Sequence, residues 1–301
     1  MQLNRKAYFF TLLTILFWGG AATAFKTALS QISPITLLSL SSVISLLVIT
    51  ILLISNHKFR LLTQLPTKQW FYLLILGAIN PFLYYIILFE AYDRLPGQVA
   101  MSLNYLWPVM LALLSVPILK HTLNRRSLFS ILLSFLGAVI IATAGDFSNW
   151  GKLDTFGLIL VLTSTVVWAS YWLLSTRLKV DATIKLFIGF LSGSLLSVIY
   201  ALWNNQLLIN LDNIPWLSVM YVGIFEMGFT FFIWLTALHL TSNAAKLANL
   251  IYLTPFVSLM LLAIFRHEEI YFTTITGLMV IIMVILAQKY WQKGFSKKTL
   301  N

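Results

Sequence analysis

Long runs of apolar residues, separated by short polar turns, dominate the chain. A helix needs about 20 mainly apolar residues to cross the hydrocarbon core of a membrane. Ten runs are of about this length, so the pattern predicts an all-α membrane protein with ten transmembrane helices. The predicted spans are 7–28, 34–55, 69–92, 97–119, 127–145, 154–177, 184–203, 214–238, 243–265 and 270–290.

Composition supports a membrane protein as well. The chain is 59% hydrophobic and only 10% charged, whereas soluble domains carry about 25% charged residues. The formal net charge of +11 is not interpreted as nucleic-acid binding, because the positive residues lie between apolar runs, where they fix the orientation of the helices. The absence of cysteine excludes disulfides and thiol catalysis.

The positive residues are distributed unequally between the two sides of the predicted bundle. Ten spans place both termini on one side, and most of the 20 Lys and Arg residues fall in segments on that side. Only Arg94, Lys152 and Arg266 fall on the other side, while Lys26 and Lys246 lie inside spans. Cytoplasmic loops carry an excess of Lys and Arg. We therefore expect a multi-pass protein of the cell inner (plasma) membrane with cytoplasmic N- and C-termini.

The second half of the chain repeats landmarks of the first half in the same order. The aligned pairs are Trp18 with Trp168, Trp70 with Trp216, Gly77 with Gly223, Tyr105 with Tyr252 and Pro108 with Pro255. The chain therefore divides into two repeats, 1–145 and 146–301, the second ending in a short basic tail. Each repeat holds five spans, an odd number, so the two copies must insert in opposite orientations. Inverted repeats are a transporter architecture with the substrate site near the midplane between the halves.

A proline interrupts an apolar run in each repeat. Pro108 lacks a backbone N–H and collides with the carbonyl four residues earlier, which predicts a helix break. In lipid a freed carbonyl needs another partner, so such a break belongs against protein or a watery cavity. Pro255 predicts the second break. The neighbouring polar and aromatic residues are predicted to bind substrate: Asn104, Tyr105, Trp107 and Tyr252, with Asn249 one turn before Tyr252.

Further aromatic residues lie near the middle of predicted helices, away from the interfacial ends. Trp18, Tyr84, Trp168 and Tyr171 are predicted to line the same cavity. Aromatic rings stack on planar substrates and attract an ammonium group through cation–π contacts. The alternative is that these rings serve helix packing or contact lipid.

Two polar residues occupy equivalent central positions in the repeats. Glu226 lies near the membrane midplane, and its repeat partner is Asn80. Ionisable groups inside a membrane are costly and suggest function. We predict that both bind polar groups of a substrate, such as an ammonium or a hydroxyl. Two alternatives for Glu226 are a role in carrying a coupled proton and a hydrogen-bonded, purely structural role.

Three other charged residues lie within or near the ends of spans. Lys26 and Glu90 either pair, form an outer gate or extend separately to the interface, and the last interpretation is favoured. Lys246 opens the ninth span. It either extends to the cytoplasmic interface, the favoured interpretation, or binds a substrate carboxylate.

Several motifs resemble the EamA family of the drug/metabolite transporter superfamily. They are Trp18-Gly19, Trp168-Ala169-Ser170-Tyr171 and the matched prolines of the fourth and ninth helices. The block 104–108 is similar to aromatic amino-acid exporters of that family. The resemblance implies a basket in which the first to fourth and sixth to ninth helices surround a substrate cavity, with the fifth and tenth outside. Glu90, Glu226 and Lys246 depart from the exporter pattern.

The chain lacks recognisable enzyme motifs. Arg266-His267-Glu268-Glu269, for example, has no second histidine at helical spacing and is not a zinc site. We therefore predict a secondary transporter or facilitator of small organic metabolites, without catalysis, cofactor or metal. Amino-acid export, with aromatic amino acids as candidates, is the leading hypothesis. The alternatives are uptake or proton-coupled exchange of another metabolite, such as a nucleoside or a cofactor, and a membrane enzyme or helical scaffold. The expected partners are a metabolite and membrane lipids, not nucleic acid, and the expected state is a monomer or weak homo-oligomer.

Overall fold

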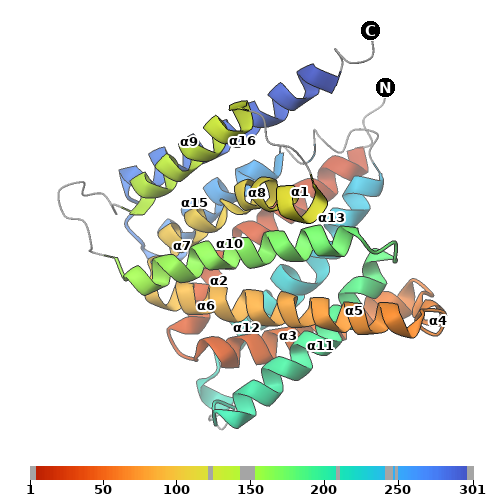
Figure 1. The fold of residues 1–301 in the computed structure, drawn as a ribbon. Coiled ribbons are helices and arrows are strands. Elements are labelled where there is room, and N and C mark those ends of the chain that lie inside the picture. The colour runs from red at the N-terminus through yellow and green to blue at the C-terminus, as the bar shows by residue number, and fades with distance from the viewer. Residues whose placement is uncertain are drawn as a thin grey trace.

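The computed structural model describes residues 5–120, 125–142, 153–207, 211–240, 247 and 250–296. Within these ranges all regular elements are helices (Figure 1). In chain order they are α1 (Arg5–Gly19), α2 (Ala21–Leu29), α3 (Pro34–Ser55), α4 (Phe59–Leu62), α5 (Thr67–Gly77), η1 (Ala78–Leu83), α6 (Tyr84–Arg94), α7 (Gly97–Asn104), α8 (Trp107–Leu119), α9 (Arg125–Ala142), α10 (Thr155–Thr176), α11 (Ala182–Trp203), η2 (Leu211–Asn213), α12 (Trp216–Tyr221), η3 (Val222–Phe229), α13 (Thr230–His239), η4 (Ile251–Leu253), α15 (Thr254–Arg266) and α16 (Phe272–Ser296).

Seven helical segments are long and apolar enough to cross a membrane. They are Arg5–Leu29, Pro34–Ser55, Thr67–Arg94, Gly97–Leu119, Thr155–Thr176, Ala182–Trp203 and Trp216–Trp234. The shorter apolar helices Leu128–Ile141, Ile251–Arg266 and Phe272–Ala287 fall within or overlap the remaining predicted spans. The first part of the predicted span 243–265 lies largely outside the described residues.

Large apolar side chains cover much of the outer surface. On α3, for example, Leu47 is 59% exposed and Ile51 is 65% exposed. Soluble monomers rarely expose extended apolar surfaces, whereas lipid solvates them. Together with the long apolar helices, this surface identifies an integral, multi-pass membrane protein.

Local signals in the sequence set the starts of several helices. Ser33 caps α3 by accepting a hydrogen bond from the Thr36 N–H, and Pro34 at the first helical position needs no partner for an N–H. Asp154 caps α10, where its carboxylate accepts from the Gly157 N–H at 2.6 Å. Asp181 caps α11 in the same way, accepting from the Thr183 N–H at 2.9 Å.

The two halves of the chain interleave. From the first half, α1 packs against α13 and α15 of the second half. From the second half, α10 packs against α6 and α8 of the first half. Helices α3 and α11 also pack together, and Ser42 Oγ lies 3.1 Å from Ser197 Oγ between them. The core is therefore formed jointly by helices from both halves.

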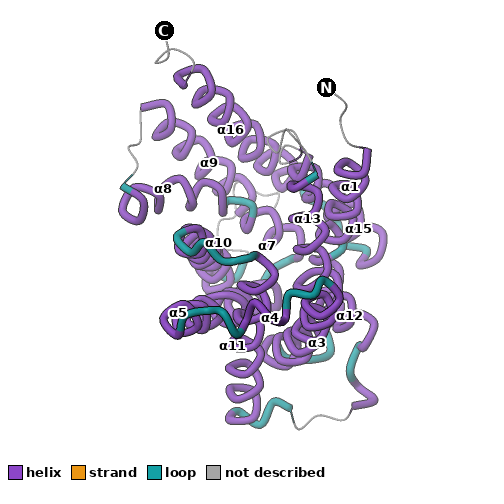
Figure 2. Tube along the Cα trace, turned by 90° about the vertical axis from the view of Figure 1, so that its right-hand side faces the viewer, coloured by secondary structure: helices purple, strands orange, loops and turns teal. Residues whose placement is uncertain are grey.

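Helices α9 and α16 pack on each other along one side of the molecule. In Figures 1 and 2 this pair lies on the opposite side of the bundle from α11. Glycines allow the close approach: a Cβ added to Gly137 would meet the Gly277 carbonyl oxygen at 2.8 Å, and one added to Gly277 would meet the Gly137 carbonyl at 2.5 Å. The pair contacts the rest of the bundle through α7.

Wide, π-type turns interrupt two of the predicted spans. The predicted spans 69–92 and 214–238 are helical, but each contains such a turn, η1 in the first and η3 in the second. In η1, Asn80 has non-helical dihedral angles and Pro81 cannot donate a helical hydrogen bond. Such turns often occur at functional sites. Asn80 and Glu226, aligned in the sequence repeat, both lie in these turns.

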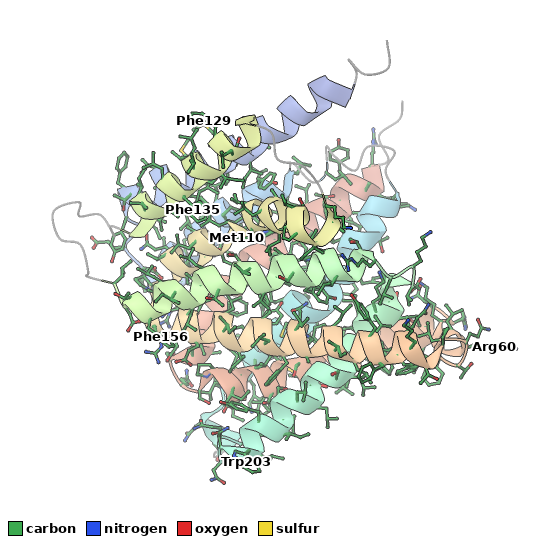
Figure 3. All side chains as sticks on the ribbon, viewed as in Figure 1. Arg60, Met110, Phe129, Phe135, Phe156 and Trp203 are labelled. Atoms are coloured by element: carbon green, nitrogen blue, oxygen red, sulfur yellow. The ribbon has the colours of Figure 1, made fainter. Side chains whose placement is uncertain are left out.

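The bundle has two distinct ends. Arg60, in α4, lies at one end, whereas Phe156 and Trp203 lie toward the other (Figure 3). The start of α1 and the end of α16 lie on the same side as α4 (Figure 1). We refer to these as the α4 end and, because α7 begins at the opposite side, the α7 end.

Candidate functional site

A cavity of about 230 Å³ lies in the centre of the bundle. Helices from both halves form its wall, among them α1, α6, α10, α13 and α15. It brings together most of the residues that the sequence predicted to bind substrate. These residues are Trp18, Tyr84, Asn104, Tyr105, Trp107, Trp168, Glu226 and Tyr252.

Glu226 is the charged residue among the described residues of the lining. The wide turn of η3 places it at the cavity wall. Its Oε1 accepts a hydrogen bond from the buried Tyr85 hydroxyl at 3.3 Å, and its backbone carbonyl accepts from Trp18 Nε1 at 3.4 Å. Glu226 is therefore connected to both α6 and α1, which belong to the other half of the chain.

Asn104 closes α7, and both polar atoms of its side-chain amide make a hydrogen bond within the protein. Its Oδ1 accepts from the Tyr84 hydroxyl at 3.4 Å, and its Nδ2 donates to Ser164 Oγ at 3.0 Å. The interruption before Pro108 makes this arrangement possible, since α7 ends at Asn104 and α8 begins at Trp107. Pro255 occupies the corresponding position in the first turn of α15.

Aromatic rings form a connected band around the cavity. The ring centroids of Trp168 and Tyr84 lie 4.6 Å apart, and those of Trp168 and Phe231 lie 6.2 Å apart. Phe231 in turn lies 5.5 Å from Trp18. The band offers ring faces and edges to a planar or cationic guest.

Other predicted site residues are not brought into the cavity lining. Asn80 and Tyr171 are buried, and neither is among the residues that line the cavity. Tyr171 lies one ring away, with its centroid 6.3 Å from that of Trp168. Asn249 and Lys246 lie outside the described residues. Substrate contact by these four residues stays a prediction.

Sequence reasoning missed several polar residues at the cavity. Thr254 and Ser258 line it, and their buried hydroxyls have no hydrogen-bond partner in the described part of the chain. Ser164, which holds Asn104, was also missed. A positional signal exists for each: Ser258 lies one helical turn after Thr254, and Ser164 one turn before Trp168, so each pair shares a helix face.

A second polar group lies at the α7 end of the cavity. The fully buried Gln98 donates from Nε2 to the Glu269 carbonyl at 2.6 Å and accepts at Oε1 from the Tyr271 N–H at 2.8 Å. Glu268 accepts from the N–H groups of Gly97 at 3.2 Å and Gln98 at 2.9 Å. These contacts tie the start of α7 to the connection between α15 and α16.

Lys26 completes this end of the molecule. Its Nζ donates to the carbonyls of Tyr92 at 2.8 Å and Leu95 at 3.0 Å, at the end of α6. Glu90 pairs instead with Arg94 at 2.7 Å, so the structure does not form the Lys26–Glu90 pair that was one of the sequence alternatives. We call Lys26, Gln98 and Glu268 the α7 polar cluster.

Two aromatic rings lie between the α7 polar cluster and the cavity. Phe25 and Tyr92 line the cavity and are almost fully buried. Their ring centroids lie 5.1 Å apart. Packed rings therefore form the part of the cavity wall that lies next to the α7 polar cluster.

Comparisons with known proteins place this architecture among transporters. The EamA-like transporter family model matches residues 5–143 and again 155–287. The chain is 24% identical over 275 residues to the uncharacterized transporter YvbV of Bacillus subtilis, covering 90% of this chain and 87% of that protein. It is 25% identical over 290 residues to an uncharacterized transporter of Archaeoglobus fulgidus, covering 94% and 98%. Protein PecM of Dickeya dadantii is 25% identical over 231 residues, covering 74% and 75%.

A solved crystal structure shares the fold. It superposes with a TM-score of 0.66 at 19% identity and covers 97% of this chain and 99% of its own. The family matches account for nearly all of the described helices, in both halves. The chain belongs to the EamA-like transporter family.

Proposed function

We propose that this membrane transporter of small molecules is a secondary carrier that works by alternating access. Its two halves are inverted repeats, which rock around the central cavity and open it to one face at a time. Two observations support the repeat: the family matches the chain twice, and α1 packs on α13 and α15 as α10 packs on α6 and α8.

The observation that carries the proposal is the central cavity between the halves. Glu226, the aromatic band, Phe25 and Tyr92 all line it. A binding site shared by two interleaved halves can change access when one half moves relative to the other. A purely structural helical bundle has no need for a central cavity lined by polar side chains, some of which lack a hydrogen-bond partner in the described part of the chain.

Among substrates, small organic metabolites with planar groups fit the aromatic band best. Export of amino acids, aromatic ones included, is the leading proposal from the sequence. The runner-up is uptake or proton-coupled exchange of another metabolite, with Glu226 carrying the proton. In either case we propose cytoplasmic termini in the cell inner membrane, which places the α4 end inside and the α7 end outside.

The absence of cysteine makes access directly testable. Ser258→Cys places a single thiol in the cavity lining, where a small, charged, membrane-impermeant methanethiosulfonate reagent can report access. Alternating access predicts labelling from the cytoplasmic face and slower labelling from the outer face. Leu195→Cys, on the apolar outer surface of α11, is the control and should resist the charged reagent. A Ser258→Cys thiol that reacts from neither face contradicts the proposal.

Flux measurements then test the substrate and the coupling. Proteoliposomes holding the full chain are loaded with labelled amino acids or nucleosides, with and without a pH gradient. Proton coupling through Glu226 predicts that Glu226→Gln abolishes the response to the gradient. An unchanged response in this variant contradicts the coupling alternative while leaving the carrier proposal intact.

A further inference from the structure

The described residues that line the central cavity include an acidic side chain but no basic one. Among the described residues that line it, Glu226 bears a carboxylate, and none is a lysine, an arginine or a histidine. Burying a charge is costly unless an opposite charge or several hydrogen bonds compensate it. When Glu226 is ionised, its negative charge is therefore not balanced by any described residue of the lining.

One oxygen of the Glu226 carboxylate is available to a bound ligand. Oε1 accepts from the Tyr85 hydroxyl at 3.3 Å, whereas Oε2 has no donor in the described part of the chain. Lys26 does not supply the missing charge. Its ammonium is engaged by the carbonyls at the end of α6 and is not part of the cavity lining.

The wall next to this carboxylate suits a cation with a planar body. Trp18 is held there by the hydrogen bond from its Nε1 to the Glu226 carbonyl. Phe231 lies 5.5 Å from Trp18, and Trp168 follows at 6.2 Å from Phe231. Ring faces attract ammonium groups, most strongly those of tryptophan and where water is excluded. The Glu226 carboxylate and the neighbouring aromatic rings thus both attract an ammonium group.

A substrate carboxylate finds no equivalent, positively charged partner among the described residues of the lining. The Asn104 amide donates to Ser164 and accepts from Tyr84. The free hydroxyls of Thr254 and Ser258 are neutral. A second carboxylate in this small cavity would also be repelled by Glu226, and repulsion between like charges is strong where the effective dielectric is low.

We infer that the cavity takes organic cations: a protonated amine on an aromatic or apolar body, without a carboxylate. This inference rests on the proposed carrier function and narrows its substrate from zwitterionic amino acids to amines. The ammonium binds Oε2 of Glu226, and the planar body lies against Trp18 and Trp168.

Matched ligands test the inference. Tryptamine and tryptophan share the indole and the amine and differ in the carboxylate, and indole lacks both charges. Binding is measured by calorimetry on the purified full chain in detergent at neutral pH. We expect tryptamine to bind at least tenfold more tightly than either tryptophan or indole. Glu226→Gln should weaken tryptamine binding at least tenfold and change indole binding less than twofold.

One further variant serves as a control. Glu269→Gln removes an exposed carboxylate at the α7 end and should leave tryptamine binding within twofold of the unmodified chain. A thermal unfolding curve for each variant confirms that it is folded.

Several outcomes would overturn the inference. Tryptophan binding as tightly as tryptamine would do so, as would tryptamine binding that survives Glu226→Gln. No binding of tryptamine, tyramine or phenethylamine would also overturn it. The carrier proposal is judged separately, because the labelling of Ser258→Cys needs no substrate.

Discussion

The two ends of the bundle are joined in different ways. At the α7 end, Gln98 and Glu268 connect α7 of the first half to the α15–α16 connection of the second half through partly buried hydrogen bonds. At the α4 end, Lys58 near α4 and Asp181 before α11 form an ion pair of 2.8 Å. Their side chains are 32% and 34% exposed.

This difference indicates which of the two sets of contacts contributes more to stability. Removing one partner of a buried, paired polar group leaves the other unpaired, at a cost of about 1–3 kcal/mol for each group. A partly exposed ion pair contributes about 0–1 kcal/mol, because water screens it. The Gln98 and Glu268 contacts should therefore contribute more stability than the Lys58–Asp181 ion pair, and substitutions of these residues should differ in the same order.

The largest effect is expected for Gln98→Ala. It leaves the partly buried Glu269 carbonyl and Tyr271 N–H without these partners, so we expect a loss of about 1–3 kcal/mol in the free energy of unfolding. Thermal unfolding of the purified chain should fall by several degrees, and labelling of Ser258→Cys from the outer face should accelerate. Gln64→Ala, an exposed residue at the α4 end, is the matched control and should change neither.

Glu268→Ala should have the next largest effect. The carboxylate accepts from two N–H groups in the first turn of α7, and an acidic cap there also complements the helix dipole. We expect a loss of about 1–2 kcal/mol, measured by the same unfolding and labelling experiments. If Glu269→Ala at the exposed neighbouring position has an equal effect, the capping role of Glu268 is wrong.

Lys26→Met should have a smaller effect. It keeps an apolar side chain of similar length but removes the ammonium that binds the carbonyls at the end of α6. A cation at a helix C-terminus contributes about 0.3–1 kcal/mol at exposed sites and up to about 2 kcal/mol when partly buried. Unfolding temperature should fall slightly, and Lys26→Arg should recover part of the loss. Full stability in Lys26→Met would show that the apolar stem, not the charge, matters here.

The smallest effect is expected at the α4 end, where it should depend on pH. Partial burial acts to raise the pKa of Asp181, but the hydrogen bond and charge of Lys58, with backbone N–H groups, outweigh it and leave the pKa below its ordinary 3.8. A lowered folded-state pKa stabilises above the unfolded value and loses that contribution as pH falls through the folded value.

Asp181→Asn should therefore cost at most about 1 kcal/mol at neutral pH, and nothing at a pH below the folded-state pKa of Asp181. The measurement is the unfolding temperature of both proteins from pH 7 down to the lowest pH that the unmodified chain tolerates. The gap between the two curves should narrow toward acid. A gap that widens toward acid contradicts the assignment of the effect to this ion pair.

Much of the fold could be predicted from the sequence because lipid imposes simple rules. An apolar run of about 20 residues has few alternatives to a spanning helix. Seven runs are indeed long apolar helices. The cavity residues beside the breaks, such as Trp107 and Tyr252, could be identified because a proline and polar aromatics are costly to expose to lipid.

The remaining features depend on tertiary contacts that leave little trace in one sequence. Gln98 and Glu268 look like ordinary residues near turns, and only the meeting of α7 with the α15–α16 connection gives them partners. Asn80 and Glu226 look equivalent in the repeat, yet only Glu226 lines the cavity. The packing around each wide turn, and not the alignment of the repeats, decides where the side chain in that turn lies. The Asn80 Oδ1, for example, is buried without a hydrogen-bond partner in the described part of the chain.

The interleaving of the halves also sets an order of events during synthesis. Trp18 of α1 and its hydrogen-bond partner Glu226 are 208 positions apart. At about 5–20 residues per second, the ribosome needs on the order of 10–40 s to make the intervening chain. During this time α1 resides in the bilayer without α13 and α15. The Trp18 indole N–H then lacks the Glu226 carbonyl that accepts its hydrogen bond in the folded protein. Assembly of the cavity is therefore among the last steps of biogenesis, and truncation before α15 should leave inserted helices that never form a site.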